Sequence, residues 1–193
     1  MQSIQRHHPT LSSWFPRLTA IAAMAIVAIV AAQARATEII PSVGITSSVH
    51  DSDRLTKGSV GLALRGDLGP LKPEISASYR TESRFDGTLE QRMWPVTASL
   101  WLAPVPMLYA GAGVGWYHTT FDYDQRRVPL IADETHEDFG VHVGGGVRVP
   151  VAPAVGVDLQ GRYVMMQKQE SRLVPSQFNP DFWTLSAGLA LHF

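Results

Sequence analysis

Residues 109–118, YAGAGVGWYH, place glycines at three alternate positions. A dinucleotide-binding loop would need the spacing G-x-G-x-x-G at the start of a helix, so that backbone N–H groups face the phosphates. Here the third glycine comes one residue too early, and residues 116–121 are mostly aromatic or β-branched, which favours a strand. In a strand these glycines would share one crowded face with Tyr109 and Tyr117.

The same period of two recurs along the chain from Thr37 onward. In Val155–Met166, for example, apolar residues such as Val157 alternate with polar residues such as Asp158. Such alternation predicts strands with one apolar face and one small or polar face. The eight predicted strands are residues 39–49, 60–68, 74–82, 94–102, 107–120, 139–149, 155–166 and 183–193.

The connections and the aromatic residues indicate which face is inside. Short connections (69–73, 103–106, 150–153) alternate with longer polar ones (50–57, 84–91, 121–137, 167–180), as in outer-membrane barrels. An aromatic residue recurs on the apolar face, which predicts an interfacial girdle on the outside of the barrel. The girdle residues are Tyr79, Trp94, Trp116, Phe139, Tyr163 and Trp183.

The opposite face carries small and charged residues and few bulky apolar ones, so it would leave voids in a soluble core. A bilayer also excludes a sheet with two open edges, so the first strand must pair with the last. The sequence therefore predicts an all-β, eight-stranded antiparallel up-and-down transmembrane β-barrel. Eight strands leave a lumen that side chains can fill.

The amino-terminal segment has the features of a signal peptide. Arg6 and Arg17 precede an apolar run over residues 18–32, and Ala34 and Ala36 form an A-x-A cleavage motif. The alternative is a retained membrane helix, but the run is shorter than the roughly 20 residues that span a bilayer. We predict a cleaved signal peptide over residues 1–36 and a barrel domain over residues 37–193.

Composition excludes several kinds of function. The whole chain has a formal net charge of −1, and cleavage would remove three arginines and no acidic residue, so nucleic acid is not an expected partner. There is no cysteine, which excludes disulfides and thiolate chemistry. No cofactor is predicted.

The chain resembles the small eight-stranded outer-membrane barrels of Gram-negative bacteria, the group of outer membrane protein A and its X and W relatives. Residues 106–121 and 139–164 carry this resemblance, together with the terminal segment WTLSAGLALHF, residues 183–193. The terminal segment resembles the family's assembly signal, which ends in a carboxy-terminal Phe, here Phe193. The resemblance implies an outer-membrane location and recognition by the insertion machinery through the last strand.

Charged residues on the inner face predict an ion-pair network in the lumen. Counting across the short turns places Arg65 near Glu74 and Arg148 near Asp158. The network would either plug the lumen, as expected for eight strands, or gate a polar pathway. Its predicted members are Arg65, Asp67, Glu74, Arg80, Arg148, Asp158 and Arg162.

Two patterns are weak candidates for catalysis. A lipid A deacylase barrel would carry a His and a Ser two residues apart near its outer rim, and the H-x-S here, residues 50–52, lies in a predicted loop of turn formers. A palmitoyl-transferring barrel would need a rim His with hydroxyl and acidic partners, for which His118, Thr119 and Asp122 are the candidates. Neither pattern matches beyond residue type, so no enzyme is predicted.

The third long connection carries two charged clusters. Arg126 and Arg127 have the guanidinium geometry that suits lipopolysaccharide phosphates. Acidic residues around His136 are candidates for a divalent cation, but no fixed ligand spacing is present, so no metal site is predicted. The alternative for both clusters is a solvated loop.

We therefore expect a monomeric outer-membrane barrel with a structural or surface-interaction role, a plugged lumen, and contacts with outer-membrane lipid and lipopolysaccharide. The alternatives are a narrow channel for small or hydrophobic solutes and, third, a lipid A-modifying enzyme.

Overall fold

The computed structural model describes residues 35–49, 57–84, 89–123, 134–166 and 181–193. Nearly all of the predicted signal peptide therefore lies outside the described residues. Within these ranges no helix is long and apolar enough to span a membrane.

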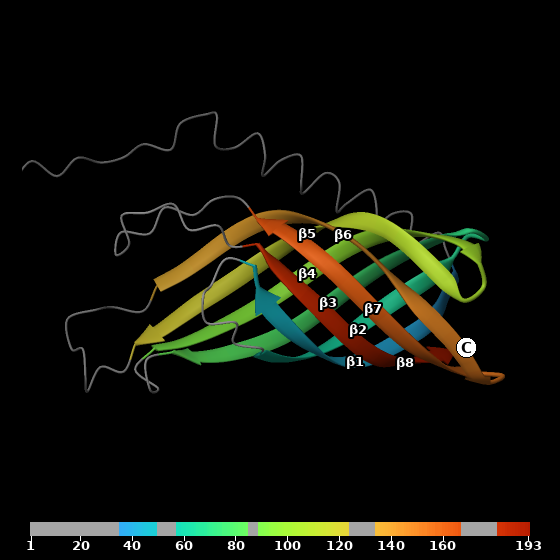
Figure 1. The fold of residues 1–193 in the computed structure, drawn as a ribbon, viewed down its shortest axis with the longest axis horizontal. Coiled ribbons are helices and arrows are strands. Elements are labelled where there is room, and N and C mark those ends of the chain that lie inside the picture. Colours follow the sequence, from blue (N-terminus) through green and yellow to red (C-terminus); the bar gives the residue numbers. More distant parts are fainter. Residues whose placement is uncertain (1–34, 50–56, 85–88, 124–133, 167–180) are drawn as a thin grey trace, which may run out of the picture.

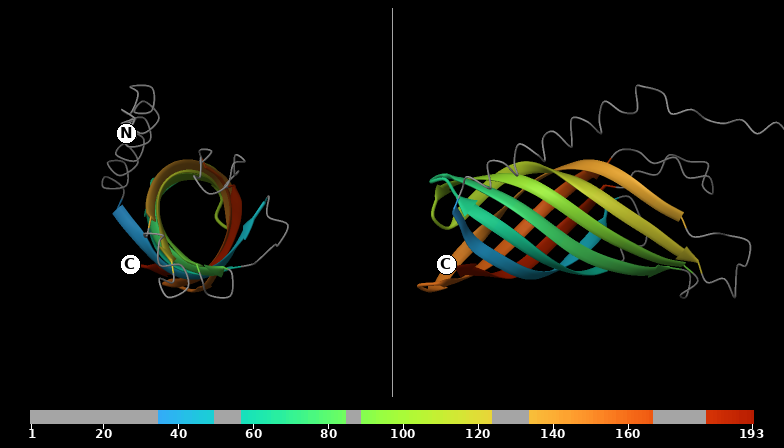
Figure 2. Two further views of the ribbon diagram at one scale, coloured as in Figure 1. Left: turned by 90° about the vertical axis from the view of Figure 1, so that its left-hand side faces the viewer. Right: turned by 180° about the vertical axis from the view of Figure 1, so that it is seen from behind.

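The described chain forms one closed antiparallel barrel in which each strand pairs with its sequence neighbours and β1 pairs with β8 (Figures 1 and 2). The strands are β1 (Arg35–Ser48), β2 (Lys57–Asp67), β3 (Leu71–Arg84), β4 (Leu89–Val105), β5 (Leu108–Tyr123), β6 (Glu134–Ala152), β7 (Val155–Met166) and β8 (Phe182–His192). This confirms the predicted eight-stranded up-and-down architecture. The short turns gather at one end of the barrel, with the carboxy terminus, and the strand ends next to the longer connections lie at the other end.

Strands β4 and β6 begin five residues before their predicted starts. The register continues through these polar extensions, where His118 lies opposite Glu137 and Thr119 lies opposite His136. The prediction relied on apolar alternation, which ends before the backbone pairing does. Polar strand ends therefore project past the apolar part of the barrel.

Side-chain orientation follows the predicted alternation. Outward-facing Val60, Leu62 and Leu185 are exposed, whereas Arg65 and Glu74 are buried in the lumen. The alternate glycines of β5 face inward, as predicted. A Cβ on Gly113 would meet the backbone oxygen of Ala98 2.3 Å away and the imidazole of His142 2.6 Å away, and a Cβ on Gly115 would meet the ring of Tyr117 2.7 Å away. Glycine is therefore favoured because the neighbouring strand and large side chains crowd this part of β5.

The expectation that the inner face has few bulky apolar side chains is wrong at particular positions. Trp101 on β4 points inward and is fully buried. Near the loop end, an inward cluster contains Met93, Tyr117, Val164, Met166 and Phe182. Small residues that face the lumen from β1, β2, β3 and the middle of β8 line the hollow beside this cluster. These small lumen residues are Ser42, Gly44, Ser59, Gly61, Ser76, Ser78, Ser186 and Gly188.

In the described strands, pairing is skipped without a change of register at two places, and each contains a proline. Between β3 and β4 the register skips the positions where Ser78 would face Pro95, then resumes unchanged. Between β1 and β8 it skips Ile40 and Pro41 in the same way. Proline has no N–H to donate to a ladder, which explains both interruptions.

Candidate functional site

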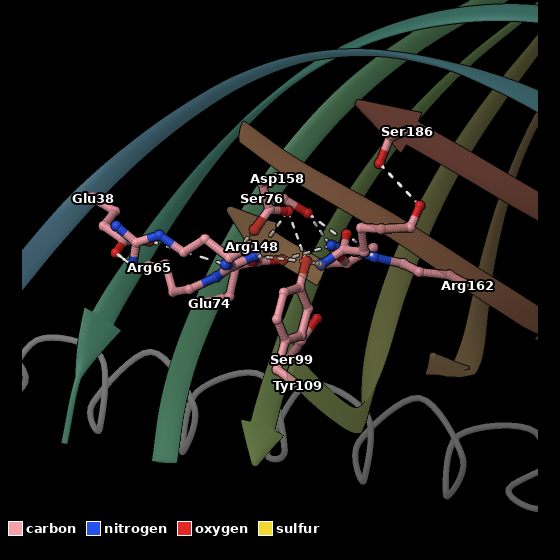
Figure 3. A network of polar contacts seen from close by, with 12 residues as sticks. Glu38, Arg65, Glu74, Ser76, Ser99, Tyr109, Arg148, Asp158, Arg162 and Ser186 are labelled. Atoms are coloured by element: carbon pink, nitrogen blue, oxygen red, sulfur yellow. Dashed lines mark hydrogen bonds and ion pairs between the residues drawn. The ribbon is translucent and has the colours of Figure 1, made fainter. Parts of the chain in front are cut away.

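The lumen contains a network of polar side chains centred on Arg65 of β2 (Figure 3). Its guanidinium donates to Glu74 at 2.8 Å and to Asp158 at 2.7 Å. The ring of Tyr109 lies 4.5 Å from the guanidinium carbon, and the Tyr109 hydroxyl donates to Asp158 at 2.6 Å. Strands β2, β3, β5 and β7 are therefore joined across the lumen at this level.

Arg162 of β7 extends the network toward the loop end. Its guanidinium donates to Glu74 at 2.6 Å, to Thr97 at 2.9 Å and to the amide oxygen of Gln160 at 2.7 Å. Glu74 thus accepts from two arginines that belong to different strands, as Figure 3 shows. Such charge-assisted hydrogen bonds are the kind that make a buried carboxylate tolerable.

Arg148 does not form the predicted pair with Asp158. The two residues are opposite one another in the β6–β7 register, but Arg148 forms an ion pair with Glu38 of β1. Asp158 is already engaged by Arg65 and Tyr109. The network therefore combines three arginines with three carboxylates, Glu38, Glu74 and Asp158, so its formal charges balance.

Two other predicted members lie elsewhere. Asp67 ends β2 at the short-turn rim, where its exposed carboxylate pairs with Lys72 at 2.5 Å and accepts the N–H of Gly69, so it is not part of the lumen network. Arg80 does face the lumen, with its guanidinium carbon 4.3 Å from the ring centre of Phe182. It lies nearer the loop end than the carboxylates do.

Sequence reasoning missed several lumen residues. Glu38 precedes the predicted first strand by one residue, and alternation extended by that residue would have placed it inside. Trp101 lies 5.5 Å, ring centre to ring centre, from Tyr109, and its inward position follows from parity along β4. Ser99 and His142 are both fully buried and are hydrogen bonded to one another at 2.9 Å. Their separation in the sequence gives no signal that predicts this contact.

Two hollows lie on either side of the network. One of about 100 Å³ lies toward the loop end against the small-residue wall, and one of about 420 Å³ opens at the short-turn end. Arg65 lines both hollows. The network is therefore the layer of side chains between them.

Comparison with known proteins agrees with this architecture. The family model described as "Outer membrane protein beta-barrel domain" matches residues 19–193. The chain belongs to this outer-membrane β-barrel family. A search of curated proteins found no match.

Solved structures with this fold include three bacterial proteins. Neisserial surface protein A has a TM-score of 0.65 and 17% identity, over 83% of this chain and 99% of that one. Ail, the attachment invasion locus protein of Yersinia pestis, has a TM-score of 0.54 and 14% identity, over 81% and 97%. OprG from Pseudomonas aeruginosa has a TM-score of 0.53 and 12% identity, over 83% and 97%. At these identities the likeness concerns the fold.

Membership of this family places the barrel in the outer membrane of a Gram-negative cell. The short turns of such barrels face the periplasm and the longer loops face outward. The predicted girdle residues all lie on the outer surface, and two of their contacts cross neighbouring strands: the ring centres are 4.4 Å apart for Tyr79 and Trp94 and 4.8 Å for Tyr163 and Trp183. Trp116 and Phe139 are opposite in register. Their place at the membrane interface stays a prediction.

The structure separates one set of candidate catalytic residues. His118 points outward, 3.8 Å from Glu137, whereas the side chain of Thr119 is buried on the inner face. Adjacent strand residues face opposite sides, so these two cannot act on one substrate. Residues 50–52 of the H-x-S candidate lie outside the described residues, as do Arg126 and Arg127, and nothing is described of the Asp122 side chain.

The last two predictions concern metal binding and the carboxy-terminal assembly signal. Among the described side chains, no group of three or more His, Asp or Glu residues is arranged to hold a metal ion. Phe193 follows β8 at the periplasmic end, and its side chain is exposed. Its recognition by the insertion machinery stays a prediction.

Proposed function

We propose that this outer-membrane barrel is a non-enzymatic scaffold that presents its outer loops for a structural or surface-interaction role, with a lumen closed to solutes. The observation that carries the proposal is the charge-balanced layer around Arg65. Each of its arginines is paired with a carboxylate, so opening a passage would separate buried charges, at a cost of several kcal/mol for each charge.

A second layer supports closure at the outer end. Met93, Tyr117, Val164, Met166 and Phe182 pack together inside the barrel and are nearly inaccessible to solvent. A solute that entered from outside would pass these apolar side chains, through the narrow hollow beside them, before it reached the charged layer. The outer loops then remain as the parts of the molecule best placed to contact a partner.

Conductance in a planar bilayer tests closure. We expect the refolded mature chain to give no discrete openings, because both layers would have to rearrange. Arg65→Ala should give measurable steps if the charged layer is the principal barrier, and the exposed Arg92→Gln variant serves as the control. Regular openings of the wild-type barrel at low voltage would contradict the closed lumen.

The surface role is tested in cells. Replacing residues 124–133 and 167–180 with short Gly-Ser linkers should lower adherence of expressing cells to glycan- or matrix-coated surfaces to the empty-vector level. Surface labelling and heat-dependent gel mobility verify that the shortened barrels are present and folded. Adherence that is unchanged by both replacements would contradict a loop-based role.

A narrow route for small hydrophobic solutes is the second candidate, because strand pairing in the wall is skipped beside the hollow at the loop end. Ser78 and Pro95 face one another where the β3–β4 pairing is skipped, and both line that hollow. An unpaired stretch of wall is costly in a bilayer and is a place where two strands can separate.

Restoring the ladder separates the two candidates. Pro95→Val supplies the missing N–H and should abolish uptake of a small apolar dye into proteoliposomes if solutes pass between β3 and β4. Ala77→Val, an outward change on β3, serves as the control. No uptake by the wild-type protein would reject this second candidate and leave the closed scaffold.

A further inference from the structure

The hollow at the periplasmic end is walled by two turns. Gly69 and Pro70 of the β2–β3 turn form one side, and residues 103–106 with Leu108 form the other. The N–H of Ala103 donates to the carbonyl of Pro70 at 2.7 Å, which holds the two turns together. The hollow is open at the periplasmic end and has a volume of about 420 Å³.

The charged side chains that line this hollow are all cationic. Among its described lining residues are Arg65, Lys72 and Arg148, and no carboxylate. Asp67 and Glu38, which are the acidic partners of Lys72 and Arg148, do not line the hollow. The side chains of Lys72 and Arg148 keep 23% and 26% of their surface exposed. Solvent in the hollow therefore meets cations whose carboxylate partners lie outside its lining.

Donors remain available on these cations. A lysine ammonium carries three N–H groups, and Asp67 accepts one from Lys72. A guanidinium carries five N–H groups, and the ion pair of Arg148 with Glu38 involves one terminal nitrogen, Nη1. Phosphate oxygens suit both groups, since guanidinium binds them in a fork and ammonium as a point charge.

The rim beside the hollow carries exposed apolar side chains next to the Lys72–Asp67 pair. These apolar side chains are Leu68, Leu71, Val105, Met107 and Leu108. They flank the cationic hollow at the level where the strands end in short turns. A ligand with one phosphate group and adjoining hydrocarbon would satisfy both surfaces, whereas a free anion would use only the cations.

We propose that the periplasmic hollow binds the phosphate group of an anionic phospholipid from the inner leaflet of the outer membrane. The phosphate lies between Lys72 and Arg148, and the acyl chains lie on the apolar rim. The shared chemistry is that of a phosphate anion, so free inorganic phosphate is the other source that the test must distinguish.

Native mass spectrometry of the barrel refolded in zwitterionic detergent tests the site. Three probes are titrated: dihexanoyl phosphatidylglycerol, dihexanoyl phosphatidylcholine and inorganic phosphate. We expect phosphatidylglycerol to bind about tenfold more tightly than phosphatidylcholine, and the Lys72→Gln/Arg148→Gln variant to lose this preference. Inorganic phosphate should compete weakly, since it lacks the apolar part.

The controls make each outcome decisive. Arg92→Gln removes an exposed cation at the outer end and should leave the preference unchanged. Heat-dependent gel mobility verifies that each variant is folded, and if the double variant does not fold, Lys72→Gln alone is measured. Equal binding of both lipids, or a preference retained without the two cations, overturns the proposal. Tight binding of inorganic phosphate without lipid binding overturns the lipid as the source.

Discussion

At the scale of single residues, Arg65 is the side chain that we expect to contribute most to the stability of the barrel. It is 4% exposed and contacts Glu74, Asp158 and Tyr109, which come from three other strands. Each partner is also buried, so the guanidinium compensates carboxylates that water cannot reach. Exposed pairs such as Lys72 and Asp67 have solvent to replace the lost partner.

Arg65→Ala should lower the free energy of unfolding by about 3–5 kcal/mol, because it leaves buried carboxylates without their cation. Lys72→Ala, the matched removal of a surface cation, should cost less than about 1 kcal/mol. Urea titration of the refolded barrel in detergent measures both. Similar midpoints for the two variants would contradict the central role of Arg65.

Gly111 offers a second test at this scale. A Cβ at this position would clash with the backbone carbonyl of Leu100 and lie 3.0 Å from the Cα of Trp101, so the neighbouring strand would have to shift. Gly111→Ala should cost about 1–3 kcal/mol through overpacking. Gly58→Ala, where a Cβ meets nothing within 4 Å, is the control and should be close to neutral. Thermal unfolding followed by circular dichroism compares the two.

At the scale of strands, Asp181 joins three elements at the outer end. Its carboxylate accepts the hydroxyl of Tyr163 at 3.0 Å and the backbone N–H of Met166 at 3.1 Å, both on β7. Its carbonyl accepts the N–H of Val49, just beyond β1, at 3.2 Å. This single residue before β8 therefore fixes where the last strand begins.

Asp181→Ala should cost about 1–3 kcal/mol, since a backbone donor and a hydroxyl lose their acceptor. Tyr163→Phe removes one of the two bonds and should cost less. Hydrogen exchange of the Met166 amide separates the effects, because it should accelerate in Asp181→Ala and remain slow in Tyr163→Phe. Unchanged exchange in both variants would show that Asp181 does not hold this strand end.

At the scale of the whole molecule, closure depends on pairing between the two ends of the chain. β1 and β8 pair over most of their length, with the interruption at Ile40 and Pro41. The predicted cleavage after Ala36 would remove Arg35 and Ala36, whose backbones pair with Asp67 and Gly66. The rest of β1 keeps its pairing with both neighbours, so closure does not need the removed residues.

We therefore expect the chain exported by a Gram-negative host to begin at Thr37 and to fold into a barrel that migrates differently before and after boiling. Intact-mass measurement of the outer-membrane fraction gives the amino terminus. Ala36→Leu, which replaces a small residue of the cleavage motif, should leave the precursor uncleaved. A mature mass that includes residues 1–36 in the wild type would contradict the prediction.

Alternation in the sequence determined the eight strands and the orientation of their side chains, since period two is a local property of extended backbone. Counting across the β2–β3 turn likewise predicted that Arg65 lies opposite Glu74, and the two residues are paired in the structure. The contacts of Asp158 with Arg65 and of Arg148 with Glu38 were decided only by the tertiary structure. These pairs cross the lumen between strands that are not consecutive in the chain. Their meeting depends on the stagger and tilt with which the barrel closes, which no local pattern records.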